Sequence, residues 1–175
     1  MNKETSPSID APAFREGMSR IVSAVHIVTT GGAGGRSGFT ATAVSAVSDE
    51  PPTVLACLNR TGHTASVLSV NGVFCVNALA AEDEALADIF AGRTAATGEE
   101  RFATGRWTSL VTGAPVLDGA LVAFDCRLVD LRPAGTHQIL IGEVVGVRQG
   151  PHRPALIYAD RAYRTLLVGA LAQTT

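Results

Sequence analysis

Residues 124–147 read FDCRLVDLRPAGTHQILIGEVVGV, two runs of alternating apolar and polar side chains with a turn between them. Alternation with a period of two is typical of half-buried strands. In the first run it holds from Phe124 to Leu128 and then shifts by one position at Val129, which predicts a bulge there. The alternation resumes through residues 139–147, and residues 133–136 supply the turn. The stretch therefore predicts a long β-hairpin.

Shorter segments on either side of this hairpin predict more strands and a few helices. Turn residues separate them, notably the glycine-rich 31–35 and the prolines at 51 and 52. The pattern favours a mainly β protein with short helices, a β-barrel decorated by helices rather than a βαβ sheet. The expected strands are 25–30, 39–48, 53–58, 73–79 and 156–158; the expected helices are one after Pro12 (Phe14, Met18, Ile21 and Val22 on one face), 63–70, 82–92 and a turn near 99–102.

Composition places the chain among ordered globular domains. It has 175 residues, 46% of them hydrophobic and 17% charged, with a net charge of −2. We expect a disordered leader over residues 1–11 and a single domain over 12–170. The scattered basic residues give no nucleic-acid footprint. Without a long apolar run or a signal peptide, a cytoplasmic protein that does not bind membranes is expected.

Several familiar kinds of chemistry find no support in the sequence. The only lysine is Lys3, close to the start of the chain, so a phosphate must be held by arginine, hydroxyl or backbone N–H groups. The histidines are scattered and the three cysteines lie far apart, which predicts reduced, buried thiols and no metal site. A glycine pattern at residues 32–37 leads into a strand instead of a helix, unlike a dinucleotide-binding loop. Any difficult chemistry is therefore expected to come from a bound cofactor.

Two segments could hold such a ligand. Residues 39–48 are almost all small, which would let a ligand lie against the backbone; close packing between sheets or subunits explains them equally well. Around residues 59–64 a strand ends and a helix begins, in a setting rich in hydroxyl and guanidinium donors that suits a phosphate. The alternative is that Thr61 or Thr64 only caps the helix.

Two further groups are less specific. Gly135, Thr136 and His137 form the hairpin turn, where a histidine is usually exposed and inert. Tyr158, Asp160, Arg161 and Tyr163 combine aromatic and charged groups, a set that also fits a surface ion pair with aromatic packing.

The order of these blocks along the chain carries a resemblance to a known family. The blocks are FREGMSRIVSAVHIVTT at residues 14–30, GFTATAVSAVSDEPPTVLACLNR at 38–60, GVFCVNALA at 72–80, GTHQILIGEVVGV at 135–147 and ALIYADRAYRTL at 155–166. They resemble the flavin reductase-like domain family, the reductase components of two-component flavin-dependent monooxygenases such as 4-hydroxyphenylacetate 3-monooxygenase reductase. The likeness covers residues from about 14 to 166.

The resemblance implies a homodimeric split β-barrel of the FMN-binding type. It also implies an NAD(P)H:flavin oxidoreductase that reduces FMN or FAD by direct hydride transfer and supplies the reduced flavin to a partner monooxygenase. Two alternatives stay open: a flavin-dependent reductase acting on a corrin or iron complex, and a non-catalytic flavin-binding module. The resemblance does not decide whether the flavin is FMN or FAD, or whether it is tightly bound or diffusible. It also does not decide between NADH and NADPH as the hydride donor.

The resemblance also assigns residues, although no protein acid or base is needed for hydride transfer itself. His63 stands where relatives have a serine-rich phosphate loop. The flavin contacts it implies are Thr40, Ala41, Thr42, Ala43, Val44, Ser45, Asn59, Arg60, Thr61, Thr64, Asn77, Ala78, Arg101 and Phe102; the NAD(P)H contacts are His137, Tyr158, Arg161 and Tyr163.

Overall fold

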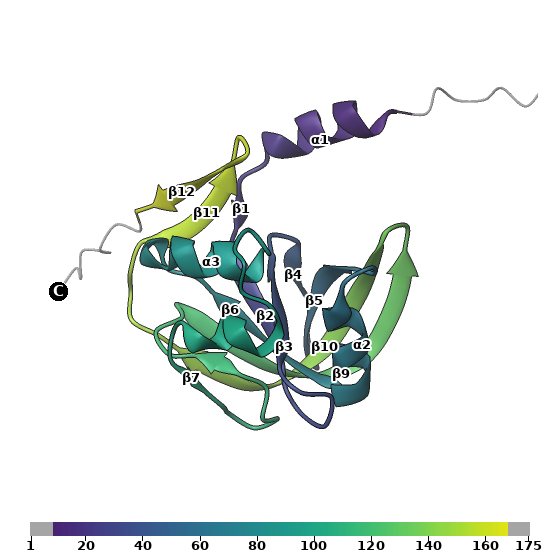
Figure 1. Ribbon diagram of the computed structural model, residues 1–175, viewed down its shortest axis with the longest axis vertical. Coiled ribbons are helices and arrows are strands. Elements are labelled where there is room, and N and C mark those ends of the chain that lie inside the picture. Colours follow the sequence, from purple (N-terminus) through teal and green to yellow (C-terminus); the bar gives the residue numbers. More distant parts are fainter. Residues whose placement is uncertain (1–8, 168–175) are drawn as a thin grey trace, which may run out of the picture.

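The computed structural model describes residues 9–167, and the first eight residues of the predicted leader and the last three of the predicted domain lie outside this range. Most strands form one curved, antiparallel sheet of seven, which confirms the mainly β prediction (Figure 1). The strands are β2 (His26–Thr30), β3 (Ser37–Ala41), β4 (Val44–Asp49), β5 (Pro52–Asn59), β6 (Val73–Ala78), β9 (Val122–Ala134) and β10 (His137–Gln149). Across the sheet their order is β3-β2-β6-β9-β10-β5-β4.

The predicted hairpin is the centre of this sheet. Strands β9 and β10 pair along their whole length, and only Gly135 and Thr136 separate them. Ile141 pairs with Asp130 whereas Gly142 pairs with Leu128, so Val129 is the extra residue of a bulge, as the sequence predicts. A second irregularity lies at residues 144–146 of β10, where the sequence pattern gave no signal.

The small-residue segment 39–48 is two strands and not one. Strand β3 pairs with β2, whereas β4 pairs with β5, so the chain passes from one edge of the sheet to the other between Ala41 and Val44. The carbonyl of Ala43 accepts a hydrogen bond from the Cys57 N–H at 3.0 Å, which continues the β4–β5 pairing by one residue toward the crossing. The prediction of a continuous extended segment is therefore wrong at Thr42 and Ala43. A single sequence cannot show this crossing, because it depends on which strands pair.

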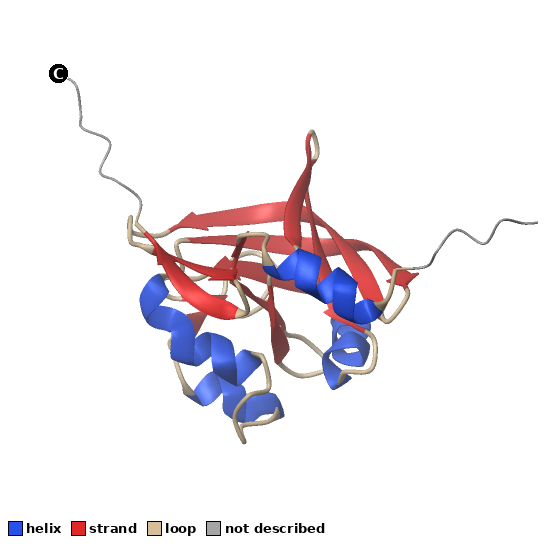
Figure 2. Ribbon diagram, turned by 90° about the horizontal axis from the view of Figure 1, so that it is seen from above, coloured by secondary structure: helices blue, strands red, loops and turns tan. Residues whose placement is uncertain are grey.

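The helices of the barrel lie on one side of the curved sheet (Figure 2). They are α2 (His63–Asn71), the 3-10 helix η1 (Ala81–Asp83), α3 (Glu84–Phe90) and the 3-10 helix η2 (Gly98–Ala103). The N-cap of α2 is Gly62, without a side-chain cap, so neither Thr61 nor Thr64 caps this helix. The helix ends at Gly72, whose φ of 65° is the left-handed conformation that favours glycine.

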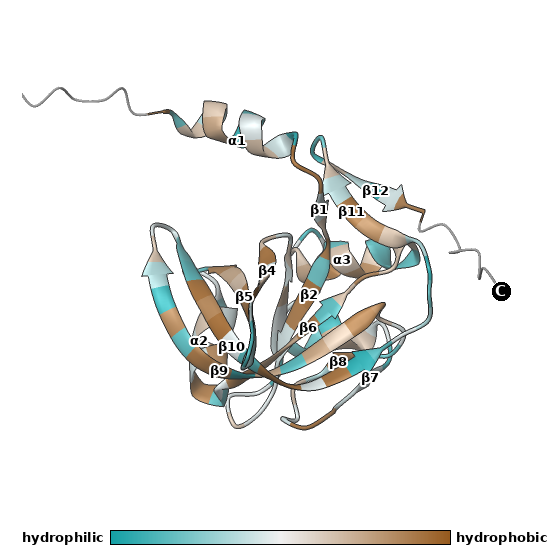
Figure 3. Ribbon diagram, turned by 180° about the vertical axis from the view of Figure 1, so that it is seen from behind, coloured by the Kyte–Doolittle hydropathy of each residue, from teal (hydrophilic) through white to brown (hydrophobic). Residues whose placement is uncertain are grey.

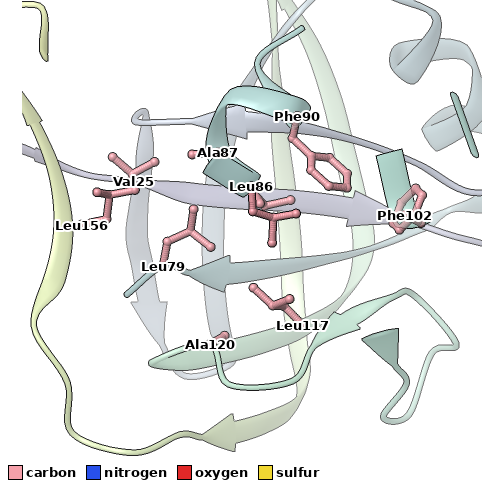
Figure 4. Packing of buried hydrophobic residues seen from close by; sticks show 10 residues of the cluster. Val25, Leu79, Leu86, Ala87, Phe90, Phe102, Leu117, Ala120 and Leu156 are labelled. Carbon is pink, nitrogen blue, oxygen red and sulfur yellow. The ribbon is translucent and has the colours of Figure 1, made fainter. Parts of the chain in front are cut away.

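An apolar cluster joins α3 and η2 to the barrel (Figure 4). Its largest members are Phe90 and Phe102, whose ring centres are 5.2 Å apart in an edge-to-face arrangement. Trp107 completes the aromatic group, with ring centres 5.4 Å and 5.1 Å from those two rings. Such edge-to-face pairs add to the stabilisation that burial provides. Through Ile27, the cluster therefore holds α3 and η2 against β2.

A second sheet of three strands lies at one end of the barrel. It has the order β1-β11-β12, and the sequence analysis anticipated only part of β11. A two-stranded ribbon completes the β structure. The bounds are β1 (Ser23–Ala24), β11 (Ala155–Ala159), β12 (Ala162–Leu166), β7 (Trp107–Thr108) and β8 (Val116–Leu117).

The first helix, α1 (Ala11–Ser19), stands apart from the barrel (Figure 1). Asp10 caps it, accepting a hydrogen bond from the Ala13 N–H at 2.8 Å, so the helix begins inside the predicted leader. Ile21 and Val22 follow the helix instead of extending its apolar face. None of its residues is buried. Within residues 9–167, none of the helices combines the length and apolar character needed to cross a membrane.

Candidate active site

A hollow of about 230 Å³ opens beside the crossing between β3 and β4. It lies between the end of β3, the loop after α3 and the β11–β12 hairpin. Two of its residues come from the predicted flavin segment and two from the predicted NAD(P)H set, so segments far apart in the sequence meet here. The lining residues are Thr40, Thr42, Ala91, Arg93, Tyr158 and Tyr163.

Two tyrosines form one wall of the hollow. Tyr158 and Tyr163 are cross-strand partners on β11 and β12, and their rings meet edge to face with centres 5.5 Å apart. The turn between them uses Asp160 and Arg161 with φ of 50° and 59°, the conformation of a tight two-residue hairpin. Burial raises the pKa of Tyr163, so its hydroxyl stays protonated and able to donate a hydrogen bond. The wall therefore offers an aromatic face together with hydroxyl groups.

Arg93 gives the hollow its positive charge. Its guanidinium carbon lies 5.2 Å from the centre of the Tyr163 ring, and Nη1 is 2.9 Å from the Asp88 carboxylate. The backbone N–H of Arg93 also donates to the Asp88 carbonyl at 3.0 Å. The side chain remains half exposed, so it has donors left for a ligand. The sequence analysis missed Arg93; its place just after the glycine that ends α3 was the available signal.

The opposite wall is the end of β3 and the crossing. The Thr40 hydroxyl donates to the Ala87 carbonyl at 2.6 Å, so it is already occupied. The Ala41 side chain is buried, whereas Thr42 and Ala43 are exposed. Among residues 9–167, no acceptor bonds the backbone N–H groups of Thr42 or Ala43. This wall therefore offers small side chains and backbone donors.

The predicted phosphate segment meets the hairpin turn at the far end of β5. The Arg60 N–H donates to the Thr136 carbonyl at 3.0 Å, and Arg60 Nη1 donates to the Gly135 carbonyl at 3.1 Å. His137 pairs directly with Asn59 across the two strands. All five residues of this contact, Asn59, Arg60, Gly135, Thr136 and His137, are exposed. The structure thus joins two of the groups that the sequence singled out.

The hydroxyl groups of this segment differ in what they can do. The amide oxygen of Asn59 accepts from both the N–H and the hydroxyl of Thr61, at 3.0 Å and 2.8 Å, which forms a tight polar turn. Thr64 is instead buried, and its hydroxyl bonds the Ser37 hydroxyl at 2.8 Å. Thr64 therefore ties α2 to β3, and its hydroxyl already has a partner inside the protein.

Asn77 also turns inward. It is fully buried, with its amide nitrogen bonding the Ile27 carbonyl at 3.0 Å and its oxygen accepting from the Leu117 N–H at 2.8 Å. Phe102 is buried in the aromatic group described above. The partners of both side chains lie in the interior, so neither side chain lines the hollow. A buried asparagine that joins three strands looks the same in sequence as one that faces a pocket.

Arg101 holds the edge of the site in place. Its guanidinium donates to the carbonyls of Gly38 at 3.2 Å and Ala96 at 3.3 Å, which fixes the loop after α3 against β3. Ala78 is half buried at the end of β6. Arg101 therefore supports the wall of the hollow through other residues.

A second, more apolar hollow of about 440 Å³ lies on the other side of the crossing. Val44 and Ser45 line it, so the structure divides the predicted flavin segment between two hollows. His26 also lines it, and its Nδ1 has no hydrogen-bond partner among the described residues. Burial lowers the pKa of His26, which keeps the imidazole neutral. We call this the barrel hollow; its remaining lining residues are Ala24, Ala46, Ser48, Asp49, Pro52, Thr53, Val54, Phe124, Val144 and Val147.

The predicted NAD(P)H contacts do not all meet within one chain. The β9–β10 turn that carries His137 and the β11–β12 hairpin that carries Tyr158 and Tyr163 project on opposite sides of the barrel end (Figures 1 and 3). The side chain of Arg161 points toward α1 and not into the hollow, since its Nη2 lies 2.8 Å from the Glu16 carboxylate. Only the two tyrosines therefore share the hollow with Thr42.

Within residues 9–167, the side chains are not arranged for metal binding or for thiol chemistry. Within residues 9–167, no three histidine, cysteine or acidic side chains gather as metal ligands. The cysteines are free; Cys75 and Cys126 are buried, and Cys57 is half buried. Burial raises the pKa of Cys126 to about 12 and that of Cys75 as well, so neither forms a thiolate at neutral pH.

Comparison with known proteins shows which family and fold the chain shares. The model of the flavin reductase like domain matches residues 18–167. FMN reductase (NADH) RutF of Ancylobacter novellus is 52% identical over 161 residues, covering 92% of this chain and 88% of that protein. RutF of Agrobacterium fabrum is 53% identical over 153 residues, 87% of each chain. BorF, the flavin reductase component of a bacterial two-component tryptophan halogenase, superposes with a TM-score of 0.83 at 31% identity, covering 90% of this chain and 98% of that one.

Proposed function

The chain belongs to the flavin reductase-like domain family, and we propose that it transfers hydride from NADH to FMN. The observation that carries the proposal is the hollow in which Thr42, from the predicted flavin segment, faces Tyr158 and Tyr163, from the predicted nucleotide set. FMN and NADH are chosen because the two RutF relatives, each more than half identical, are named for that pair.

The residues around the crossing fit a flavin. A flavin ring is flat and carries several hydrogen-bond acceptors, so it needs close access to donors without bulky side chains in the way. Thr42 and Ala43 offer exposed small side chains and backbone N–H groups without acceptors among residues 9–167. We propose that these groups, with the backbone of Val44 and Ser45, hold the ring edge and favour the negative charge of the reduced form. The side chains of Val44 and Ser45 line the barrel hollow on the other side of the crossing.

The second wall suits the nicotinamide nucleotide. Flavin, when bound, would supply the hydride acceptor of the reaction. The part of the chain is to orient the two rings and to exclude water. Tyr158 and Tyr163 present an aromatic surface for a flat ring, and Arg93 is placed for a phosphate or carboxamide beside it. No side chain is assigned a proton transfer.

The opposite end of the site suits the flavin phosphate. Asn59, Arg60 and Thr61 form an exposed polar turn before α2. A guanidinium and backbone N–H groups at a helix start are common phosphate ligands. His137 is the strand partner of Asn59, so we propose that within one chain it acts from the phosphate end of the flavin.

The wider role follows from the family. We propose a homodimer in the cytoplasm that releases reduced flavin to a partner monooxygenase or halogenase. The support is that BorF, a neighbour by structure, is the reductase component of a two-component system. Reduction of a corrin or iron complex by a retained flavin is the competing function, and a non-catalytic flavin-binding module is the third.

Steady-state oxidation of NADH, with FMN varied and oxygen as the final acceptor, tests the proposal. Turnover that rises and saturates with added FMN supports a reductase of diffusible flavin. Turnover that is independent of added FMN, by protein purified with flavin bound, favours the competing reductase. FMN binding without NADH oxidation contradicts both and leaves the binding module.

A further inference from the structure

The N-terminal helix presents an apolar surface that its own barrel does not cover. Phe14 and Met18 are four residues apart and so lie on the same face of α1, and they are 56% and 47% exposed. Ile21 and Val22, in the linker to β1, are 53% and 61% exposed. The linker is strongly hydrophobic (Figure 3). We call these four residues the apolar arm.

Two bonds hold the apolar arm away from the barrel of its own chain. The N–H of Asp160 donates to the Ser19 carbonyl at 2.7 Å, at the end of α1. Arg161 pairs with Glu16 on the same helix at 2.8 Å. Both contacts come from the turn of the β11–β12 hairpin, so α1 is anchored at that hairpin and continues away from the barrel (Figure 1).

The barrel hollow is a second apolar surface without a cover. Its aliphatic and aromatic lining comes from β4, β5, β9 and β10, including Val44, Phe124 and Val144. Val147 at its rim is 52% exposed. An apolar hollow of this size is costly to leave in water.

We propose that the apolar arm of one copy of this chain docks in the barrel hollow of a second copy, and that the second copy returns the same contact. The proposal deepens the homodimer of the proposed function and rests on it. A single chain carries both uncovered surfaces, and its own arm is fixed elsewhere. A reciprocal exchange covers both surfaces and closes with twofold symmetry, which leaves no free end for further growth. Charge agrees: α1 exposes Arg15, and the hollow has Asp49 at its edge.

The test begins with one substitution on each surface, Met18→Glu on the arm and Val147→Glu on the hollow. Each places a carboxylate in the proposed contact, twice per symmetric dimer, so we expect the dissociation constant of the dimer to rise about a hundredfold. Val70→Glu is the matched control, because Val70 is 66% exposed on α2, outside both surfaces. Sedimentation velocity of the full chain gives the oligomeric state, and thermal unfolding shows that each variant is folded.

Mixing the two variants gives the decisive result. The Val147→Glu copy keeps an intact arm and the Met18→Glu copy keeps an intact hollow, so the mixture should form a heterodimer through one arm although each variant alone is monomeric. Monomeric variants that do not combine would overturn the arm-in-hollow contact, as would variants that stay dimeric like the wild type. A wild type that is monomeric at every concentration overturns the homodimer too. NADH oxidation with added FMN, measured on the same samples, reports separately on the reductase proposal.

Discussion

The guanidinium of Arg93 lies over the ring of Tyr163, with 5.2 Å between its central carbon and the ring centre. The two residues are seventy positions apart in the sequence, Arg93 in the loop after α3 and Tyr163 on strand β12. Their contact closes the side of the candidate active site that faces away from the flavin segment. It gives one wall both an aromatic surface and a positive charge, which is the combination that a nicotinamide nucleotide needs.

Arg93→Gln should raise the Michaelis constant for NADH about tenfold, because a hydrogen bond to a charged group is lost. The turnover number at saturating NADH and the affinity for FMN should change little, since the proposed flavin position is against the other wall. Steady-state kinetics with each ligand varied in turn separate these effects. Arg106→Gln, which removes an arginine that is 88% exposed, is the control. An unchanged Michaelis constant would remove Arg93 from the nucleotide site.

Arg60→Gln should weaken FMN about tenfold and leave riboflavin unaffected, because riboflavin lacks the phosphate that Arg60 is proposed to bind. Fluorescence titration of the two flavins measures both affinities. Arg132→Gln on the β9–β10 hairpin is the control, since Arg132 is exposed and pairs with Asp130. An equal loss for both flavins would mean that Arg60 acts through the Gly135–Thr136 turn and not through the phosphate.

Asn77→Ala should lower stability without a direct effect on ligand binding. The substitution leaves the buried N–H of Leu117 without its acceptor, which costs about 1–3 kcal/mol. Chemical denaturation measures this loss, and FMN titration of the folded protein should match the wild type. Asn59→Ala, which removes an exposed asparagine, should cost much less stability. Weaker FMN binding by folded Asn77→Ala would return this side chain to the site.

His26 should make the protein less stable in mild acid. Burial lowers its pKa in the folded protein below the ordinary value of 6.5. Just below pH 6.5 the unfolded chain therefore binds a proton that the folded protein does not, so stability falls as the pH falls and levels off below the folded pKa. Denaturation of the wild type and His26→Gln across this window measures the difference. The variant should lose this part of the pH dependence, whereas His63→Gln, at an exposed site, should keep it. Parallel curves for His26→Gln and the wild type would contradict the assignment.

Local patterns predicted much of the fold. The β9–β10 hairpin and its bulge at Val129 follow from one shift in the alternation of residues 124–128. Helix α2 was expected over residues 63–70 from similar local signals, and the structure extends it by one residue to Asn71. The split of residues 39–48 into two edge strands could not be predicted in this way, because it depends on pairing between β3 and β2 and between β4 and β5.

Only part of the site could be anticipated from the sequence, because the rest depends on contacts between distant segments. Thr42, Tyr158 and Tyr163 meet in one hollow, as the resemblance implies. Arg93 was missed because its position after the glycine that ends α3 marks only a helix end, whereas its contact with Tyr163 on β12 depends on the folded chain. Asn77 and Thr64 carry polar side chains whose partners are all inside the protein, and only the folded chain shows those partners. His137 was placed with the tyrosines by analogy, whereas strand register places it beside Asn59.

The most direct test of the account is a single turnover without oxygen, in which protein loaded with FMN is mixed with NADH and the loss of flavin absorbance is followed. The account predicts that bound FMN is reduced far faster than free FMN, at a rate that saturates with NADH, and that Tyr163→Ala needs more NADH to reach saturation. Reduction of bound FMN no faster than that of free FMN would contradict the claim that this hollow brings the two rings together.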